Sequence, residues 1–292
     1  MKTYLLLSAC LLMAACASRN EIVSLQELDT MLSEEFKADQ PGGSVLVKKG
    51  DSIIFLKSYG LADLETKEKI TENTLFNLGS VSKTFVSNGI LILNEDGQLS
   101  LEDSLSQYFG DFNSSDIAGK VTIKHLLSHT SGLPDIRNVS DNYDFFLTAK
   151  DEENFAPIKL ADSLNFEPGE KFEYSNPAFN GLALIIEKVT GQPWQKFVTD
   201  RIFAPAGMLK SKITDGPYPE VGVAHAYSLK NGRYTEDDYG EFPTFAAAGN
   251  GGVWSSVMEL AVYERAIGQN TFLGKELTDD SRRIFQPANW TD

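Results

Sequence analysis

The sequence predicts an α+β fold with an antiparallel sheet, and three features of residues 25–93 support this prediction. An amphipathic segment comes first, two short strands joined by a tight turn follow it, and a long apolar stripe at helical spacing comes next. A helix, then a hairpin, then further helices is an order typical of α+β proteins.

The first helix is expected over residues 25–37, where the apolar side chains recur every three or four positions. It should end before the Pro41-Gly42-Gly43 segment, because proline and glycine terminate helices. Residues 44–49 and 52–59 are predicted as two strands, with Gly50-Asp51 as the hairpin turn. The apolar side chains of the helix are Leu25, Leu28, Met31, Leu32 and Phe36.

A second helix is predicted to begin close to Ser80 and to end near Gly97. Ser80 and Lys83 would then be neighbours on one face, so the amine can reach the hydroxyl. A lysine whose pKa is lowered by burial or by nearby positive charge can take the serine proton. The alternative is an N-cap serine followed by a solvated lysine. The apolar stripe consists of Val81, Phe85, Val86, Ile90 and Leu93.

A third, mostly buried helix is predicted to begin at Pro177, because proline suits the first helical position. Asn176 is then expected to be its N-cap, and Gly191 marks its end. The residues expected to be buried are Leu182, Leu184, Ile185, Ile186 and Val189.

The composition is that of a folded, acidic protein. The chain has 292 residues, 42% of them apolar, and 26 Lys+Arg against 41 Asp+Glu give a formal net charge of −15. An apolar fraction of this size is far from that of disordered chains. Because a net negative charge repels polyanions, we expect no nucleic-acid partner.

The N-terminus is predicted to be a signal peptide over residues 1–15. Its apolar stretch, residues 4–15, is too short to span a bilayer. The small residues before Cys16 resemble the lipobox of bacterial lipoproteins, which implies that Cys16 is lipidated and becomes the mature N-terminus. Cys10 fits the pattern less well, and plain secretion with cleavage near Ala17 is the alternative.

Residues 16–24 are then expected to form a tether, and residues 25–292 a single domain, because no repeat or long linker divides them. Both cysteines lie in the signal region, so the domain has no internal disulfide. We expect a location in the bacterial cell envelope, on its periplasmic side, with membrane contact only through the lipid anchor.

Residues 76–85 (FNLGSVSKTF) closely resemble the nucleophile segment of the serine hydrolases related to class C β-lactamases, D-alanyl-D-alanine carboxypeptidases and certain esterases. Tyr174-Ser175-Asn176 resembles the Tyr-x-Asn motif of the same family. The resemblance implies that Ser80 is the nucleophile, that Lys83 and Tyr174 move its proton, and that Asn176 binds a substrate amide. It implies no cofactor and no metal.

Three further segments resemble the family without carrying chemistry, so the likeness extends from about residue 41 to residue 268. His129 lies in one of them and is expected to be structural. The segments are residues 123–134, 202–208 and 247–256.

The family's third motif, Lys-Thr-Gly or His-x-Gly on a strand after the Gly-Gly loop, finds no match after Ser256. Lys230-Asn231-Gly232 has suitable residues but precedes that loop and is expected to be a surface turn. The resemblance therefore implies a C-terminally truncated β-lactamase/transpeptidase-like domain with a large helical subdomain, with a natural short form as the alternative. The hairpin over residues 44–59 would have an unpaired edge. Loss of one oxyanion-hole donor typically costs about a hundred- to a thousand-fold in rate.

Other enzyme classes fit these residues less well. There is no Gly-x-Ser-x-Gly segment for a Ser-His-Asp hydrolase, no histidine spacing for zinc, and no Gly-Lys-Ser/Thr for a phosphate loop. We therefore expect a serine hydrolase that forms an acyl-enzyme with an amide, β-lactam or ester, such as a small molecule or a cell-wall peptide. The alternative is a non-catalytic or very slow penicillin-recognising sensor on the same scaffold.

Overall fold

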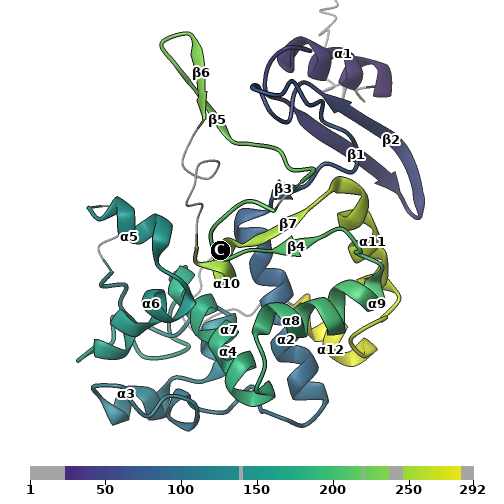
Figure 1. The fold of residues 1–292 in the computed structure, drawn as a ribbon. Coiled ribbons are helices and arrows are strands. Elements are labelled where there is room, and N and C mark those ends of the chain that lie inside the picture. Colours follow the sequence, from purple (N-terminus) through teal and green to yellow (C-terminus); the bar gives the residue numbers. More distant parts are fainter. Residues whose placement is uncertain (1–23, 138–140, 220, 237–245, 284–292) are drawn as a thin grey trace, which may run out of the picture.

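In the computed structural model, helices pack around the long helix α2 (Ser82–Glu95), and a β-hairpin lies at one end of the molecule (Figure 1). The structure describes residues 24–137, 141–219, 221–236 and 246–283. The predicted signal peptide, Cys16 and all of the predicted tether except Ser24 lie outside these residues. The mixed α+β architecture with antiparallel strands confirms the predicted fold class.

The N-terminal helix and the hairpin form where the sequence predicts them. Helix α1 (Leu25–Glu35) begins with a capping box, in which Ser24 and Glu27 bond each other's backbone N–H groups. It ends two residues earlier than predicted, because Phe36 is already extended. Strands β1 (Gly43–Lys49) and β2 (Ser52–Tyr59) pair antiparallel. Among the described residues they pair with no other strand, so the expected open edge is present there.

The core of the molecule is built by α2 and α7 (Asn176–Thr190). The two helices approach closely at Gly89, where an added Cβ would lie 2.9 Å from Ile186 Cδ1. Helix α7 ends at Gly191, whose left-handed φ of 67° closes the helix as predicted. Both helices are largely buried, which fits their apolar sequences.

A small central sheet lies between the hairpin and the helices (Figure 1). Its order is β3-β7-β4, and all its pairs are antiparallel. A separate hairpin contains the surface turn predicted at Lys230-Asn231-Gly232, where Asn231 and Gly232 both have positive φ. The strands are β3 (Phe76–Asn77), β4 (Lys212–Ile213), β7 (Val253–Ser255), β5 (Tyr227–Lys230) and β6 (Arg233–Glu236).

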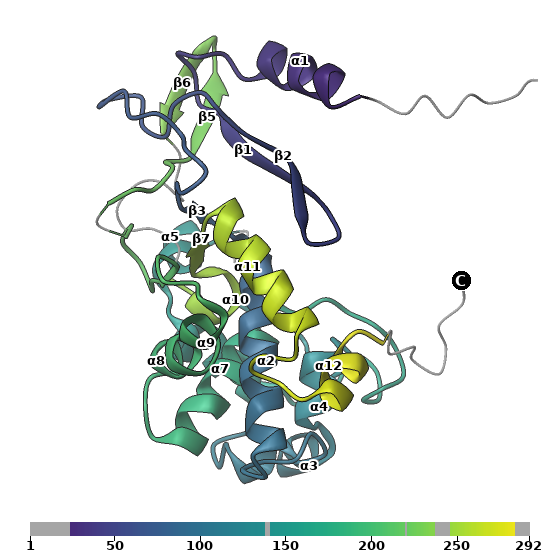
Figure 2. The same ribbon diagram turned by 90° about the vertical axis from the view of Figure 1, so that its right-hand side faces the viewer.

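The remaining helices surround this core, and α11 (Val257–Gly268) runs beneath the β1–β2 hairpin, where Lys48 pairs with Glu264 (Figure 2). None of the helices in the described ranges has the length and apolar character needed to cross a bilayer. The short helices are η1 (Gly79–Val81), η2 (Leu105–Gln107), α3 (Ser115–Lys120), α4 (Ile123–Leu127), α5 (Tyr143–Thr148), α6 (Asp151–Phe155), η3 (Ala156–Leu160), α8 (Trp194–Val198), η4 (Thr199–Phe203), α9 (Ala204–Ala206), α10 (Ala248–Gly251) and α12 (Lys275–Ser281).

Candidate active site

Ser80 lies in the short helix η1, directly before α2. The turn that presents it forms because Asn77 Oδ1 accepts the Gly79 N–H at 2.7 Å, and Gly79 has a left-handed φ of 49°. Lys83 lies one turn further on, and its Nζ donates a hydrogen bond to Ser80 Oγ at 3.1 Å. The contact predicted from the Ser-x-x-Lys spacing is therefore present in the structure.

Lys83 is a buried amine between a carbonyl and two aromatic rings. Only 6% of its surface is exposed, and Nζ donates to the backbone carbonyl of Asn250 at 2.8 Å. The rings of Tyr174 and Phe179 have their centroids 5.3 and 5.8 Å from Nζ. Burial lowers the pKa of Lys83 below 10.5, and the hydrogen bond and charge of Tyr174 only partly oppose this. The neutral amine, which can accept a proton, is therefore more accessible than in a solvated lysine.

Tyr174, which lies two residues before α7, also contacts Ser80. Its hydroxyl donates to Ser80 Oγ at 2.9 Å, and half of its side chain is exposed. Burial opposes ionisation of the phenol, but the hydrogen bonds to Ser80 and Lys83 outweigh it, so the pKa of Tyr174 lies below 10. Ser80 Oγ thus accepts hydrogen bonds from two groups that can exchange protons with it.

His129 holds the backbone on both sides of Tyr174. Its carbonyl accepts the Glu173 N–H at 2.9 Å, and its Nδ1 accepts the Ser175 N–H at 3.1 Å. Its ring lies against the Tyr174 ring, with the centroids 4.4 Å apart. Burial and, second, the charge of Lys83 lower the pKa of His129 to about 4, so the ring is a neutral acceptor. These contacts agree with the structural role expected for His129.

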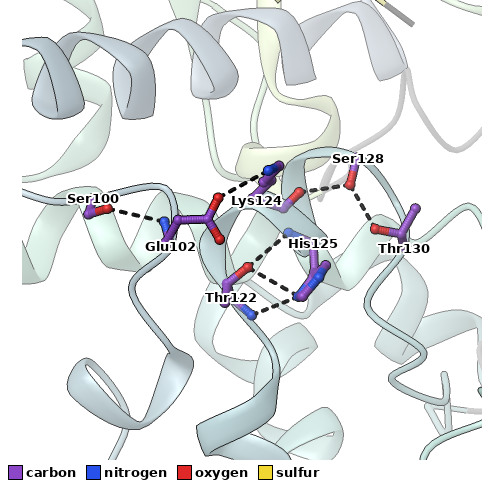
Figure 3. A network of polar contacts seen from close by, with 7 residues as sticks. All are labelled: Ser100, Glu102, Thr122, Lys124, His125, Ser128 and Thr130. Atoms are coloured by element: carbon purple, nitrogen blue, oxygen red, sulfur yellow. Dashed lines mark hydrogen bonds and ion pairs between the residues drawn. The ribbon is translucent and has the colours of Figure 1, made fainter. Parts of the chain in front are cut away.

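The turn that carries His129 is itself fixed by a network of polar contacts (Figure 3). His125 Nδ1 accepts the Thr122 N–H at 3.1 Å and so closes the N-terminus of α4. Ser128 Oγ donates to the Lys124 carbonyl and bonds Thr130 Oγ1, both at 2.8 Å. The backbone around Tyr174 is therefore bonded to a segment that lies almost fifty residues earlier in the sequence and has its own network of hydrogen bonds.

Asn176 is not the N-cap of α7, which corrects the sequence prediction. Ser175 caps the helix, since its side chain accepts the Ala178 N–H and its backbone is extended, while Asn176 is the first helical residue. Pro177 lacks an N–H and so cannot use a cap, which leaves Ala178 as the donor. With the cap supplied by Ser175, the Asn176 side chain lines the pocket next to Ser80.

The pocket beside Ser80 has a volume of about 630 Å³. Its polar groups include Asn77, Asn176 and His225, and His225 Nδ1 lies 2.8 Å from Glu236 Oε1. Its apolar walls leave room for the acyl part of a substrate. They are formed by Leu61, Ile70, Phe76, Leu78, Phe146 and Trp254. Within the described ranges, no cluster of three His, Cys, Asp or Glu side chains could bind a metal.

The contact of Asn250 with Lys83 is not evident from the sequence. Residues 247–256 resemble the family's Gly-Gly loop, but only the tertiary structure places the Asn250 carbonyl against Lys83, which is 167 positions earlier. The one sequence signal was the run Gly249-Asn250-Gly251-Gly252, because glycines permit close backbone approach.

Comparisons with known proteins found a matching family model and similar sequences. A family model described as Beta-lactamase matches residues 27–290. Penicillin-binding protein 4* of Bacillus subtilis (strain 168) is 32% identical over 270 residues, which are 88% of this chain but 58% of that protein. The chain therefore spans less than two thirds of that relative.

Two solved structures have a similar fold. The penicillin binding protein from Bacillus halodurans superposes with a TM-score of 0.74 at 27% identity, over 86% of this chain and 75% of that one. The D-amino acid amidase from Ochrobactrum anthropi SV3 superposes with a TM-score of 0.66 at 25% identity, over 80% and 67% of the two chains.

Proposed function

The chain belongs to the Beta-lactamase family, and on that premise we propose that it is a serine hydrolase that cleaves an amide, β-lactam or ester through an acyl-enzyme on Ser80. The observation that carries this proposal is the pair of hydrogen bonds to Ser80 Oγ, from Lys83 at 3.1 Å and from Tyr174 at 2.9 Å. The likeness to a D-amino acid amidase supports acyl transfer as the reaction class.

In the proposed reaction, Ser80 Oγ attacks the substrate carbonyl carbon while its proton passes to Lys83 or Tyr174. The carbonyl oxygen becomes an oxyanion, and the Ser80 backbone N–H at the positive end of α2 supplies one contact to it. Tyr174, whose hydroxyl lies 2.9 Å from Ser80 Oγ, then donates a proton to the leaving amine or alcohol. Water attacks the acyl-enzyme with the same groups acting in reverse, which releases the acid and restores the Ser80 hydroxyl.

Asn176 is proposed to orient the substrate. Its amide lines the pocket near Ser80 and carries both a donor and an acceptor, so it can bond an amide group of the acyl part. This role concerns binding more than proton transfer.

We also propose a location in the bacterial cell envelope, with Cys16 lipidated and the domain on the periplasmic side. The support is the signal-like segment at residues 1–15 and the small residues before Cys16. A substrate from the cell wall, or a small molecule that reaches the envelope, fits this location.

The direct test is to incubate the protein with a fluorophosphonate or a penicillin and locate the adduct by mass spectrometry. The adduct is expected on Ser80 and should be absent from a Ser80→Ala variant, and an adduct on another residue would contradict the proposal. Turnover of p-nitrophenyl acetate then separates an enzyme from a sensor, because a sensor would be acylated once without continued release of product.

A further inference from the structure

A buried carboxylate that the proposed reaction does not use, and that is not among the residues lining the pocket, is linked to Lys83 by hydrogen bonds. Asp151 begins α6 and is 8% exposed. Its Oδ1 accepts hydrogen bonds from Asn180 Nδ2 at 2.6 Å and from the Gly249 N–H at 2.8 Å. Its Oδ2 accepts from Trp194 Nε1 at 2.9 Å. All three donors are neutral.

Two of these hydrogen bonds lead to the residue that contacts Lys83. Gly249 directly precedes Asn250 in α10, and Asn180 Oδ1 accepts from Asn250 Nδ2 at 2.9 Å. The Asn250 carbonyl in turn accepts from Lys83 Nζ at 2.8 Å. Asn180 is fully buried and Asn250 is 4% exposed, so these bonds lie in a region of low dielectric constant, where they are stronger than in water.

The packing around Gly249 leaves no room for α10 to shift toward Asp151. An added Cβ on Gly249 would lie 2.9 Å from Ala183 Cβ and 3.1 Å from Asp151 Oδ1. The backbone therefore lies directly on α7 and on the carboxylate, and the hydrogen bonds to Asp151 oppose motion in the other direction.

We propose that Asp151 is a positioning residue, which holds the Asn250 carbonyl against Lys83 Nζ and thereby sets how readily Lys83 exchanges a proton with Ser80. The inference rests on the roles proposed for Ser80 and Lys83. A carboxylate suits this task because it has two oxygens that accept several N–H groups and no donor of its own. Burial raises the pKa of Asp151 to about 6, which shows that burying this carboxylate costs free energy of folding. An apolar side chain that only filled the space would not have this cost.

The test compares Asp151→Ala with Trp194→Phe and with the double variant Asp151→Asn/Trp194→Phe. Alanine removes every acceptor, whereas asparagine keeps one oxygen for Asn180 and Gly249. Asparagine also puts an NH₂ donor where Asp151 Oδ2 accepts the indole N–H of Trp194, and two donors would then face each other. In the double variant, phenylalanine at position 194 removes the indole donor. Trp194→Phe alone is the matched control, since its hydrogen bond lies on the side of Asp151 that does not lead to Lys83.

The readout is the pH profile of kcat/KM with p-nitrophenyl acetate. In Asp151→Ala we expect a loss of about tenfold or more, as for one hydrogen bond to a charged group. We also expect the rising limb of the pH profile, which reports deprotonation of Lys83, to move to lower pH. The Lys83 ammonium gives up its proton more easily when it loses its carbonyl acceptor. Tyr174 and His129, the other titratable groups facing Lys83, are unchanged in every variant.

The double variant should recover most of the activity and return the limb to its wild-type position. Trp194→Phe should lower the stability of the fold. Its kcat/KM should stay within twofold of wild type, and the rising limb of its pH profile should not shift. If folded Asp151→Ala has the wild-type rate and limb, the proposal is overturned. Should Asp151→Ala not fold, Asp151→Leu keeps more of the side-chain volume while removing the carboxylate from both Asn180 and Gly249, and an unshifted limb in that variant overturns the proposal equally.

Hydrogen exchange gives a second readout that does not depend on turnover. The amides of residues 247–252 should exchange faster in Asp151→Ala than in wild type, but not in Trp194→Phe. Unchanged exchange in Asp151→Ala would overturn the positioning role even in a protein whose Ser80 is not acylated. Failure of the proposed function, seen as absence of Ser80 labelling in wild type, is thus distinguishable from failure of this inference.

Discussion

The candidate active site and the N-terminal hairpin are held in place by different forces. Lys83, Asn180 and Asn250 are buried and joined by hydrogen bonds that cross between α2, α7 and α10. The β1–β2 hairpin contacts α1 through an ion pair and a hydrogen bond to Asp29, and helix α1 has no buried residue.

Both the stability of the fold and the chemistry of the site depend mainly on the helical core. Hydrogen bonds in a buried, low-dielectric region are stronger and more costly to break than ion pairs at the surface. A two-stranded sheet by itself is marginally stable in water. We therefore expect substitutions in the helical core to affect both folding and activity, and substitutions in the hairpin to affect neither strongly.

The largest effect is expected for Lys83→Ala, which removes the proposed base from Ser80. Acyl-ester turnover should fall about a hundred- to ten-thousand-fold, the usual contribution of a positioned acid–base group. The measurement is kcat/KM with p-nitrophenyl acetate. Lys120→Ala, which removes an exposed lysine paired with Glu167, is the matched control and should be unchanged. Undiminished hydrolysis by Lys83→Ala would remove the lysine from the mechanism.

The second effect concerns Phe155, a fully buried side chain at the end of α6. Phe155→Ala should lower the free energy of unfolding by about 3–5 kcal/mol, because it leaves a cavity next to Phe109. Urea denaturation measures the change. Phe155→Leu, which keeps most of the volume, should cost less than half as much, and equal costs would show that the site collapses around the smaller side chain.

The third effect is the pH dependence that His129 gives to stability. Since its pKa falls from 6.5 to about 4 on folding, the unfolded chain binds a proton there that the folded protein excludes. The stability contributed by the neutral ring is therefore present above pH 6.5 and lost as the pH falls toward 4. Urea unfolding at several pH values should show this loss.

The control for this prediction is His129→Asn. Asparagine tolerates the positive φ of 56° and offers an acceptor close to the position of Nδ1. Asp151 titrates in the same window with the opposite sign, because its raised pKa favours the folded state below about pH 4 and opposes it above pH 6. The contribution of Asp151 is the same in wild type and in His129→Asn, so it cancels in the difference between their free energies of unfolding. A difference that does not change between pH 6.5 and 4 would contradict the assignment.

The smallest effect is expected for Phe36→Ala, the same substitution made beside the hairpin. Phe36 stacks on Tyr59 with the ring centroids 6.3 Å apart and is only partly buried. The free energy of unfolding should fall by about 1 kcal/mol, with kcat/KM unchanged. A cost as large as that of Phe155→Ala would show that the hairpin is part of the cooperative core.

The two longest helices, the N-terminal helix and the N-terminal hairpin could be predicted from the sequence. The spacing of apolar residues and the positions of glycine and proline gave α1, the hairpin, the start of α2 and the end of α7. The prediction that Asn176 caps α7 was wrong by one residue. Ser175 and Asn176 are both good N-cap residues, and only the backbone geometry distinguishes them. Motif resemblance pointed to Ser80, Lys83 and Tyr174, which the structure brings together.

Helical spacing is a local property of the chain, so it predicts that Ser80 and Lys83 are neighbours, and the order of helix and hairpin predicts the α+β class. The tertiary structure decided what surrounds that pair: the Asn250 carbonyl, the ring of His129 against Tyr174 and the carboxylate of Asp151. These contacts join residues far apart in the chain, and no periodicity or propensity encodes them. The burial that lowers the pKa of Lys83 arises only when α2, α7 and α10 pack together.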